Sequence, residues 1–361
     1  MKVKIGELTK IKTGKLDANA SSEEGKYPFF TCSKEPLRIS TYSYDCECVL
    51  VAGNGDLNVK YYNGKFDAYQ RTYIIEDDSS GKLHMPYLYY FMESYVNELR
   101  QQAIGGVIKY IKLGNLTDAL VELPPIDQQK AIVEILEKTR RILDKRNEEM
   151  NALDDLIKAR FVEMFGDPIL NPNGYLKEKI EKHIDLLTGY PFKSEQYIEE
   201  GINICGGLII MPQKIKWNEC VHWSSVEGFE DYLLNENDIV MALDRPWISE
   251  GFKMAKVDAE HLPALLIQRT ARIRAIDMNQ DYLYYCFING GFDKHSNVTG
   301  SLVPHISAKD ISSFEIMIPP TELQKQFADF VHQVDKSKFA VQKTLEQTQT
   351  LFDSLMQKYF G

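Results

Sequence analysis

Two stretches of this chain repeat each other at a constant offset of 195 positions, and this repeat constrains the fold more than any other feature. Residues 87–166 and 282–361 keep their landmarks in step without a gap. The paired landmarks are Tyr87-Leu88-Tyr89-Tyr90 with Tyr282-Leu283-Tyr284-Tyr285, Gly105 with Gly300, Pro124-Pro125 with Pro319-Pro320, Gln129-Lys130 with Gln324-Lys325, and Phe165-Gly166 with Phe360-Gly361. Two similar halves predict pseudo-twofold symmetry and two similar but non-identical surfaces.

The repeat extends upstream with small insertions. Gln70-Arg71-Thr72 reappears as Gln268-Arg269-Thr270, while residues 15–45 and 190–236 do not match each other. Shared frame positions with different intervening segments are typical of two domains that have one fold and two specificities. We therefore expect the non-matching segments to carry most of the discrimination between targets.

Composition indicates a soluble globular protein. The 361 residues are 44% apolar, and no apolar run approaches the roughly 18 residues of a membrane span. The start of the chain has no apolar signal region, and the six cysteines form no zinc pattern and do not occupy repeated positions. These features predict a reduced, cytoplasmic protein without structural disulfides, metal or membrane contact.

The charge distribution argues against a simple nucleic-acid binder. The net charge is −10, with 15 basic and 16 acidic side chains in residues 1–122 and 14 basic and 22 acidic ones in residues 167–317. No domain is basic overall, so we expect weak non-specific affinity for DNA. Binding to DNA would depend on local basic patches or on a partner that supplies positive charge.

Apolar patterning and turn residues predict a mixed α/β domain in the first 122 residues. The predicted strands are 48–52, 71–75, 107–111 and 120–123, the predicted turns are 53–55 and 63–64, and the predicted helix is 86–102.

Each copy ends in a long helix that a Pro-Pro pair opens. Apolar residues recur every seven positions along both helices, which is typical of a coiled-coil seam. The predicted seam consists of Leu136, Leu143, Met150, Ile157, Phe327, Val334, Val341, Leu345 and Phe352. Because a long helix with one narrow apolar stripe needs a partner, we expect the two helices to pair with each other rather than to lie on their own domains.

The predicted fold class is therefore α+β. We expect two similar mixed α/β domains separated by two long helices that form an antiparallel coiled coil, in a pseudo-twofold, circular arrangement. The expected boundaries are 1–122 for the first domain, 123–166 for the first helix, 167–317 for the second domain and 318–361 for the second helix. Antiparallel pairing would put the two domains at opposite ends of a rod.

The heads of the two helices carry a family resemblance. Leu123-Pro124-Pro125-Ile126-Asp127-Gln128-Gln129-Lys130 and Ile318-Pro319-Pro320-Thr321-Glu322-Leu323-Gln324-Lys325 each follow a domain of variable sequence. With these two segments, the chain resembles the specificity subunit of a Type I restriction–modification system. The resemblance covers essentially the whole length of the chain. The resemblance implies two target-recognition domains, each of which reads one half of a bipartite site in double-stranded DNA, with the helix pair setting the spacing between halves.

The resemblance also implies partners and cofactors. Two methyltransferase subunits would dock on the helices, and restriction–translocase subunits would join the larger complex. The partners would use S-adenosylmethionine for adenine methylation and ATP with magnesium for cleavage. This chain would bind none of these cofactors and would not be an enzyme by itself.

Candidate DNA-contacting residues are basic and polar side chains near glycines and strand ends, because such side chains hold phosphates and reach base edges. In the first domain and then the second they are Lys12, Lys15, Lys26, Asn54, Arg71, Lys109, Tyr190, Lys193, Arg245, Arg269, Ser301 and His305. Arg71 and Arg269 are shared by both copies, so they could instead brace the fold. Arg245 and Lys193 are the strongest individual candidates.

Two alternatives of other classes stay open at this point. A self-contained restriction or methylation enzyme would need a phosphate-binding loop or the Asn/Asp-Pro-Pro-aromatic tetrapeptide of an amino-methyltransferase, and the sequence has neither. A coiled-coil scaffold without a role on DNA would not present polar, concave loops on its domains.

Overall fold

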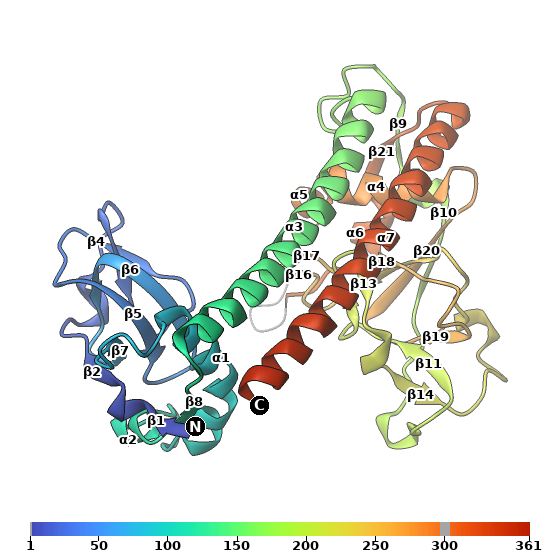
Figure 1. The fold of residues 1–361 in the computed structure, drawn as a ribbon. Helices are drawn as coiled ribbons and strands as arrows, with labels where there is room; N and C mark the ends of the chain where they lie inside the picture. The colour runs from blue at the N-terminus through green and yellow to red at the C-terminus, as the bar shows by residue number, and fades with distance from the viewer. Residues whose placement is uncertain (1, 297–303) are drawn as a thin grey trace. The chain divides into compact units, whose positions relative to one another are not determined.

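The computed structural model describes residues 2–296 and 304–361, which divide into two compact units. Unit 1 consists of Met1–Glu149 with Val341–Gly361, and unit 2 consists of Met150–Ala340. Each unit therefore combines one globular domain with the start of one long helix and the end of the other. Figure 1 shows the chain as a ribbon and labels most of its helices and strands.

Unit 1 is built on a six-stranded sheet in the order β2-β7-β5-β6-β3-β4. Its strands are β1 (Lys2–Lys4), β2 (Thr9–Thr13), β3 (Tyr27–Phe30), β4 (Leu37–Ile39), β5 (Tyr44–Ala52), β6 (Val59–Ala68), β7 (Thr72–Asp77) and β8 (Leu120–Glu122), and its short helices are α1 (Met85–Gln102) and α2 (Leu113–Thr117). The helix α1 packs against β5 and β6, and β1 pairs with β8 beside the start of the first long helix.

The helix α1 forms where the sequence predicts it. Pro86 stands in its first turn, where a missing N–H costs little. Leu88, Met92 and Leu99 fall on one face at helical spacing and are fully buried. This face closes the main core of unit 1 over the sheet.

Unit 2 has two main sheets, of order β10-β20-β15-β18 and β14-β11-β19. Its strands are β9 (Lys177–Lys179), β10 (Ile184–Thr188), β11 (Ile202–Cys205), β12 (Ile210–Met211), β13 (Lys214–Ile215), β14 (Val221–Trp223), β15 (Ile239–Ala242), β16 (Trp247–Ile248), β17 (Gly251–Phe252), β18 (Met254–Lys256), β19 (Ala264–Leu266), β20 (Thr270–Ala275) and β21 (Glu315–Met317). Its short helices are α4 (Gln280–Asn289), α5 (Phe292–His295) and α6 (Ala308–Ser312).

The structure repeats with the offset that the sequence shows. The long helices α3 (Ile126–Phe165) and α7 (Thr321–Phe360) begin and end 195 residues apart, as do α2 and α6, and β8 and β21. The repeat also reaches the segments whose sequences do not match. The strand β3 runs parallel to β6, and β11 runs parallel to β19 with equivalent register. The frame is thus conserved between copies even where side chains differ.

A buried tyrosine in α1, and its counterpart in α4, forms a hydrogen bond to the strand that precedes the long helix of the same repeat. The hydroxyl of Tyr87 donates to the carbonyl oxygen of Glu122 at 3.0 Å, and the hydroxyl of Tyr282 donates to that of Met317 at 2.8 Å. Both tyrosines are almost completely buried, so these bonds satisfy hydroxyls that would otherwise be unpaired in the core. This explains why the tyrosine recurs at the head of both repeats.

The long helices pack against each other within each unit, as the seam predicts. In unit 2, Ile157 of α3 and Phe327 and Val334 of α7 share one buried cluster. In unit 1, Leu136 and Leu143 of α3 pack with Phe352 of α7. The start of one helix therefore lies beside the end of the other, which is the antiparallel arrangement. The remaining predicted seam positions are Val341, which is buried, and Met150 and Leu345, which are half-buried.

Two local predictions were wrong. Residues 107–111 form no strand: Val107 and Ile108 are exposed, and Tyr110 makes only isolated bridges to Ile104 and Asn54. The two glycines before them allow the chain to loop outward, so the apolar alternation there is not the face of a sheet.

The predicted turn at Asn63-Gly64 is also wrong, because both residues lie inside β6 opposite Glu47 and Cys46 of β5. A local turn signal was overridden by a continuous eight-residue ladder. The turn of this hairpin lies instead after Ala52, where Gly55 takes a φ of 69°.

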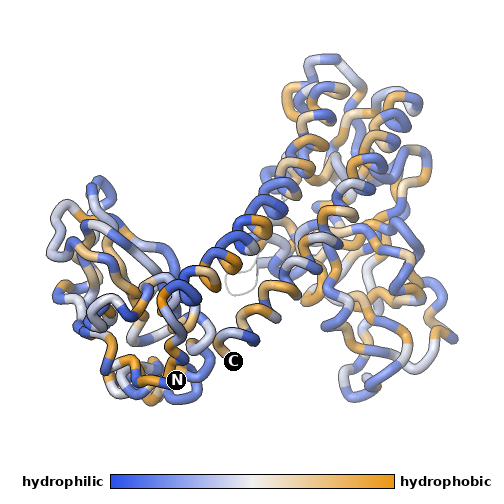
Figure 2. Tube along the Cα trace, in the orientation of Figure 1, coloured by the Kyte–Doolittle hydropathy of each residue, from blue (hydrophilic) through white to orange (hydrophobic). Residues whose placement is uncertain are grey.

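Hydropathy along the long helices is mixed. Figure 2 shows hydrophobic and hydrophilic residues alternating along α3 and α7, as expected for helices with one buried stripe. Within residues 2–296 and 304–361, no helix combines the length and the apolar character that crossing a membrane requires.

Candidate nucleic-acid interface

Each unit has a loop corner where three segments meet beyond the end of a buried strand. We call these the unit 1 corner (residues 53–58, 69–71 and 104–111) and the unit 2 corner (residues 243–253, 267–269 and 304–306). The same backbone hydrogen bonds hold both. In the unit 1 corner, Gly53 donates to Arg71 at 2.8 Å and Ile111 donates to Gly53 at 2.9 Å. In the unit 2 corner, Leu243 donates to Arg269 at 2.9 Å and Ile306 donates to Leu243 at 3.0 Å.

The unit 1 corner brings together three predicted residues. Asn54 bridges to Tyr110 through the backbone, and Arg71 and Lys109 are exposed beside it. The carbonyl of Lys109 accepts the N–H of Gly55 at 3.0 Å, which fixes the loop that carries both. Two cations and an amide on one rigid loop cluster can contact phosphates and base edges.

The unit 2 corner brings together Arg245, Arg269 and His305 around a carboxylate that the sequence prediction missed. The Oδ1 atom of Asp244 lies 3.3 Å from Nη1 of Arg269 and 2.8 Å from Nδ1 of His305. Asp244 thus contacts two side chains that stay partly exposed, and it occupies the position of Asn54 in unit 1.

A cavity of about 540 Å³ opens at the unit 2 corner. Its polar lining includes Arg245, Lys253, Gln268 and Arg269, together with Asp244 and Glu219. Three basic side chains against two carboxylates leave a small positive excess at this cavity, and the rest of its lining is mostly apolar. A concave, locally positive site is the kind of surface that attracts a polyanion.

Lys253 braces this cavity from inside. It is only 7% exposed, and its Nζ donates to the carbonyl of Gly207. Burial, and then the charge of Arg245, lower the pKa of Lys253. In unit 1 the side-chain nitrogen of Asn58 donates to the carbonyl of Cys32 at 2.8 Å, so the two corners use different residues for one structural task.

The other predicted residues of unit 1 lie outside the corner. Lys12 on β2 is paired with Glu76 and lies 4.9 Å from the ring centre of Tyr44. Burial opposes the charge of Lys12, but the hydrogen bond and attraction from Glu76 outweigh it and raise the pKa of the lysine. Lys15 and Lys26 are exposed on loops before β3. Lys15 lies next to the corner segment 69–71, because its N–H donates to the carbonyl of Ala68 at 3.2 Å and the N–H of Gln70 donates to the carbonyl of Leu16 at 2.9 Å.

Two predicted residues of unit 2 precede the three corner segments in the sequence, although the carbonyl of Tyr190 accepts the N–H of Gln268 in the corner at 2.8 Å. Tyr190 packs edge-on against Phe192, Phe229 and Tyr232, so its ring belongs to an aromatic cluster. Lys193 is exposed and precedes a short 3-10 helix. Ser301 lies outside the described residues.

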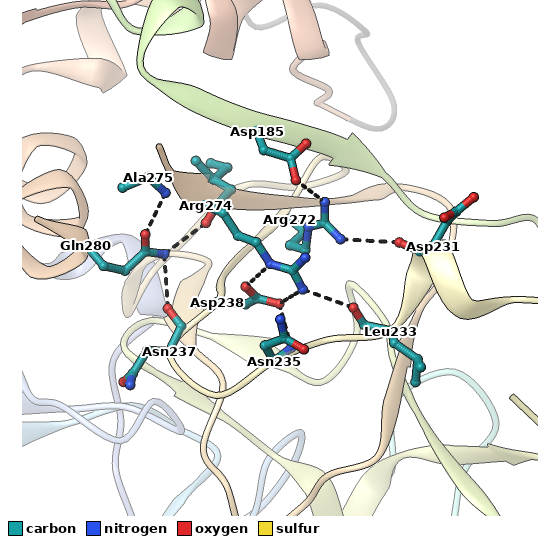
Figure 3. A network of polar contacts seen from close by, with 11 residues as sticks. Asp185, Asp231, Leu233, Asn235, Asn237, Asp238, Arg272, Arg274, Ala275 and Gln280 are labelled. Carbon is teal, nitrogen blue, oxygen red and sulfur yellow. Dashed lines mark hydrogen bonds and ion pairs between the residues drawn. The ribbon is translucent and has the colours of Figure 1, made fainter. Parts of the chain in front are cut away.

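Two further arginines of the second domain are occupied structurally (Figure 3). Two guanidinium nitrogens of Arg274 donate hydrogen bonds to the buried carboxylate of Asp238, and Arg272 on β20 forms an ion pair with Asp185 on β10. Both arginines are therefore committed to holding the sheet. Arg245 and Arg269, on the corner, are the arginines of this domain that stay exposed.

Sequence reasoning missed Asp244 and Lys253 because neither lies in a motif. The available signal for Asp244 was its offset of 190 from Asn54, the same offset that relates Ala242 to Ala52. No sequence offset relates Lys253 to Asn58. Their equivalence appears only in the structure, where the carbonyl of Lys253 accepts the N–H of Ala242 and the carbonyl of Asn58 accepts the N–H of Ala52.

Comparison with known proteins gives consistent matches. The family described as "Type I restriction modification DNA specificity domain" matches residues 1–153 and 189–348. The chain is 37% identical over 156 residues to the EcoDI specificity subunit of Escherichia coli, covering 43% of this chain and 34% of that protein. It is 23% identical over 386 residues to the MjaVIII specificity subunit of Methanocaldococcus jannaschii, covering 98% and 90%.

The fold has solved counterparts. The S subunit of a Type I restriction–modification system from M. genitalium superposes with a TM-score of 0.62 at 16% identity, covering 100% of this chain and 96% of the other. A chain from a study of complex assembly in the Type I system gives 0.53 at 16% identity, covering 100% and 97%. The match to the E. coli relative EcoDI spans only about a third of that protein. Because the family model matches most of the length of the chain, in the two segments 1–153 and 189–348, the chain belongs to the Type I restriction–modification DNA specificity family.

Proposed function

We propose that this chain is the DNA-recognition subunit of a Type I restriction–modification complex. Each globular domain, with the boundaries expected above, reads one half of an asymmetric bipartite site in double-stranded DNA through its corner. The antiparallel helices set the distance between the halves and dock two methyltransferase subunits. Restriction–translocase subunits complete the assembly.

One observation carries this proposal beyond family membership. The two corners share their backbone bonds, but the residues at equivalent half-buried or exposed positions differ: Asn54 stands against Asp244, Gly55 against Arg245, and Tyr110 against His305. A rigid common frame with exchanged polar side chains is what two readers of different base sequences require.

Chemistry is assigned to the partners in this proposal. S-adenosylmethionine would be bound by the methyltransferase subunits, and ATP and magnesium by the restriction subunits. In the described parts of this chain, no cluster of three or more His, Cys, Asp or Glu side chains could hold a metal ion. The net charge of −10 fits a subunit whose partners supply much of the phosphate contact.

Methylation mapping tests the proposal. The chain would be expressed with its methyltransferase partner in a host that lacks DNA methylation, and modified adenines would be located by single-molecule sequencing. We expect one asymmetric motif with two defined halves and a fixed gap. The methyltransferase subunit expressed alone is the control and should give no motif. A soluble complex that modifies no defined motif would contradict the proposal.

A further inference from the structure

The backbone of Arg245 adopts a conformation that disfavours any side chain. Its φ is 46°, in the left-handed region. The equivalent residue of the unit 1 corner is Gly55, with a φ of 69°. The two N–H groups also donate to equivalent carbonyls, Gly55 to Lys109 at 3.0 Å and Arg245 to Pro304 at 2.7 Å. One backbone position therefore holds glycine in one copy and arginine in the other.

Glycine enters the left-handed region without strain, whereas a residue with a Cβ does not. Unit 1 shows that glycine satisfies this turn completely. Arginine in unit 2 costs stability at a site where an unstrained residue is available to the fold. Strained residues that persist in this way cluster at functional sites. Five other described non-glycine residues have a positive φ, and one of them, Arg269 with a φ of 67°, lies on the same corner.

The surroundings leave the guanidinium group of Arg245 available. It is exposed and lines the 540 Å³ cavity. The neighbouring carboxylate of Asp244 is engaged by Arg269 and His305. Among residues 2–296 and 304–361, no carboxylate forms an ion pair with Arg245, in contrast to Arg272 and Arg274 in Figure 3.

Two other basic side chains, Lys253 and Arg269, lie near Arg245. Lys253 lines the same cavity, and the charge of Arg245 contributes to lowering its pKa, after burial. Arg269 lies on the other side of Asp244. An anionic or electron-rich ligand is therefore favoured at this point.

We propose that Arg245 reads a guanine in the half-site bound by unit 2, with Asp244 as a positioning residue that holds Arg269 and His305 beside it. This inference rests on the proposed function and deepens it. A guanidinium group matches the O6 and N7 acceptors of guanine in the major groove with two parallel donors. Because Gly55 has no side chain, unit 1 makes no such contact, and its half-site is read by other groups.

The substitution Arg245→Gly tests this with little risk to the fold, since it installs the residue that unit 1 uses. The full chain would be assembled with its methyltransferase partner, and the methylated motif would be mapped for both forms. We expect one guanine position in one half to become degenerate, while the other half and the gap stay the same. Short duplexes in which that G·C pair is replaced should bind the unaltered complex about 10- to 100-fold more weakly and should bind the variant no more weakly than the original site.

Controls separate the possible results. Lys214→Ala removes one exposed charge of unit 2 outside the cavity lining and should leave the motif intact. Thermal unfolding should show Arg245→Gly to be as stable as the parent or more so. If the unaltered complex gives no bipartite motif, the proposed function itself fails. If it does, and the variant keeps every guanine or loses affinity equally on all sequences, Arg245 does not read a base and the inference is overturned.

Discussion

The side-chain oxygen of Gln324 accepts the backbone N–H of Asn279 at 2.9 Å, which ties the start of α7 to the start of α4. Its amide nitrogen donates to the carbonyl of Pro319 at 2.9 Å. Gln129 makes the same pair of bonds in unit 1, to His84 and Pro124, both at 2.8 Å. The glutamine that follows each Pro-Pro pair is therefore a buried connector between the long helix and its own domain.

Replacing this connector should destabilise unit 2. Gln324→Leu keeps the approximate size but leaves a buried N–H and a buried carbonyl unpaired, because Gln324 is only 2% exposed. We expect a loss of about 2–4 kcal/mol in the free energy of unfolding, measured by urea denaturation. Gln342→Leu is the matched control, since Gln342 is exposed on the same helix and should change stability by less than about 0.5 kcal/mol. Equal effects from both variants would contradict the role given to Gln324.

Cys46 should react slowly with alkylating reagents, although its side chain is only half-buried. Burial, followed by the hydrogen bond to Glu76, raises the pKa of its thiol to about 11. At pH 8 only about 0.1% is then thiolate, so iodoacetamide should modify it roughly 200-fold more slowly than in the unfolded chain. Mass spectrometry of the labelled peptide at several pH values measures this.

The raised pKa of Cys46 also determines how the free energy of unfolding changes with pH. The folded state holds the Cys46 proton more tightly than the unfolded state, so the contribution is complete below the unfolded pKa of about 8.5. It is lost as the pH rises toward 11. Cys46→Ser should therefore flatten the fall in unfolding free energy between these pH values. A labelling rate at pH 8 equal to that of the unfolded chain would refute the account.

Asp244→Asn should weaken discrimination by unit 2 without harming the fold, because unit 1 has Asn54 at this position. Loss of the carboxylate frees Arg269 and His305 and removes a charge that repels DNA. We expect non-specific affinity to rise several-fold and the specificity ratio to fall about tenfold, measured by fluorescence anisotropy at fixed salt. Unchanged discrimination would show that Asp244 does not position its neighbours.

Lengthening both helices together should lengthen the gap in the target. One heptad inserted after Lys145 and one after Ala340, at points 195 residues apart, keeps the seam in register, because both helices gain the same whole repeat. Seven residues add about 10 Å of helix, which corresponds to about three base pairs. Methylation mapping should show unchanged halves and a longer gap. An insertion in one helix alone is the control and should disrupt the seam; an unchanged gap after the double insertion would contradict a spacing role.

Sequence patterns predicted those parts of the fold that rest on periodicity. The apolar rows of α3 and α7 and the inward face of α1 follow from helical spacing, and the repeat gave the second copy of each. Local signals failed where longer-range pairing decided the outcome, as at Asn63-Gly64, or where glycines led the chain outward, as before Val107.

The candidate site was harder to predict, because its parts come from three separate segments of each unit. Arg245, Arg269 and His305 could be proposed individually, but their meeting around Asp244 depends on loops that differ in length between the copies. Lys12 and Tyr190 have side-chain types that suit DNA contact, and the structure places the first beside Glu76 and the second in an aromatic cluster. Their contact with DNA stays a prediction.

The central claim is that each unit reads its own half of the target, and a domain exchange tests it most directly. Residues 167–317 would be replaced by the corresponding domain of a relative with a different known half-site, and the methylated motif would be mapped before and after. The account predicts that one half changes to that of the relative, while the other half and the gap stay as they were. A motif in which both halves change, or neither does, would contradict it.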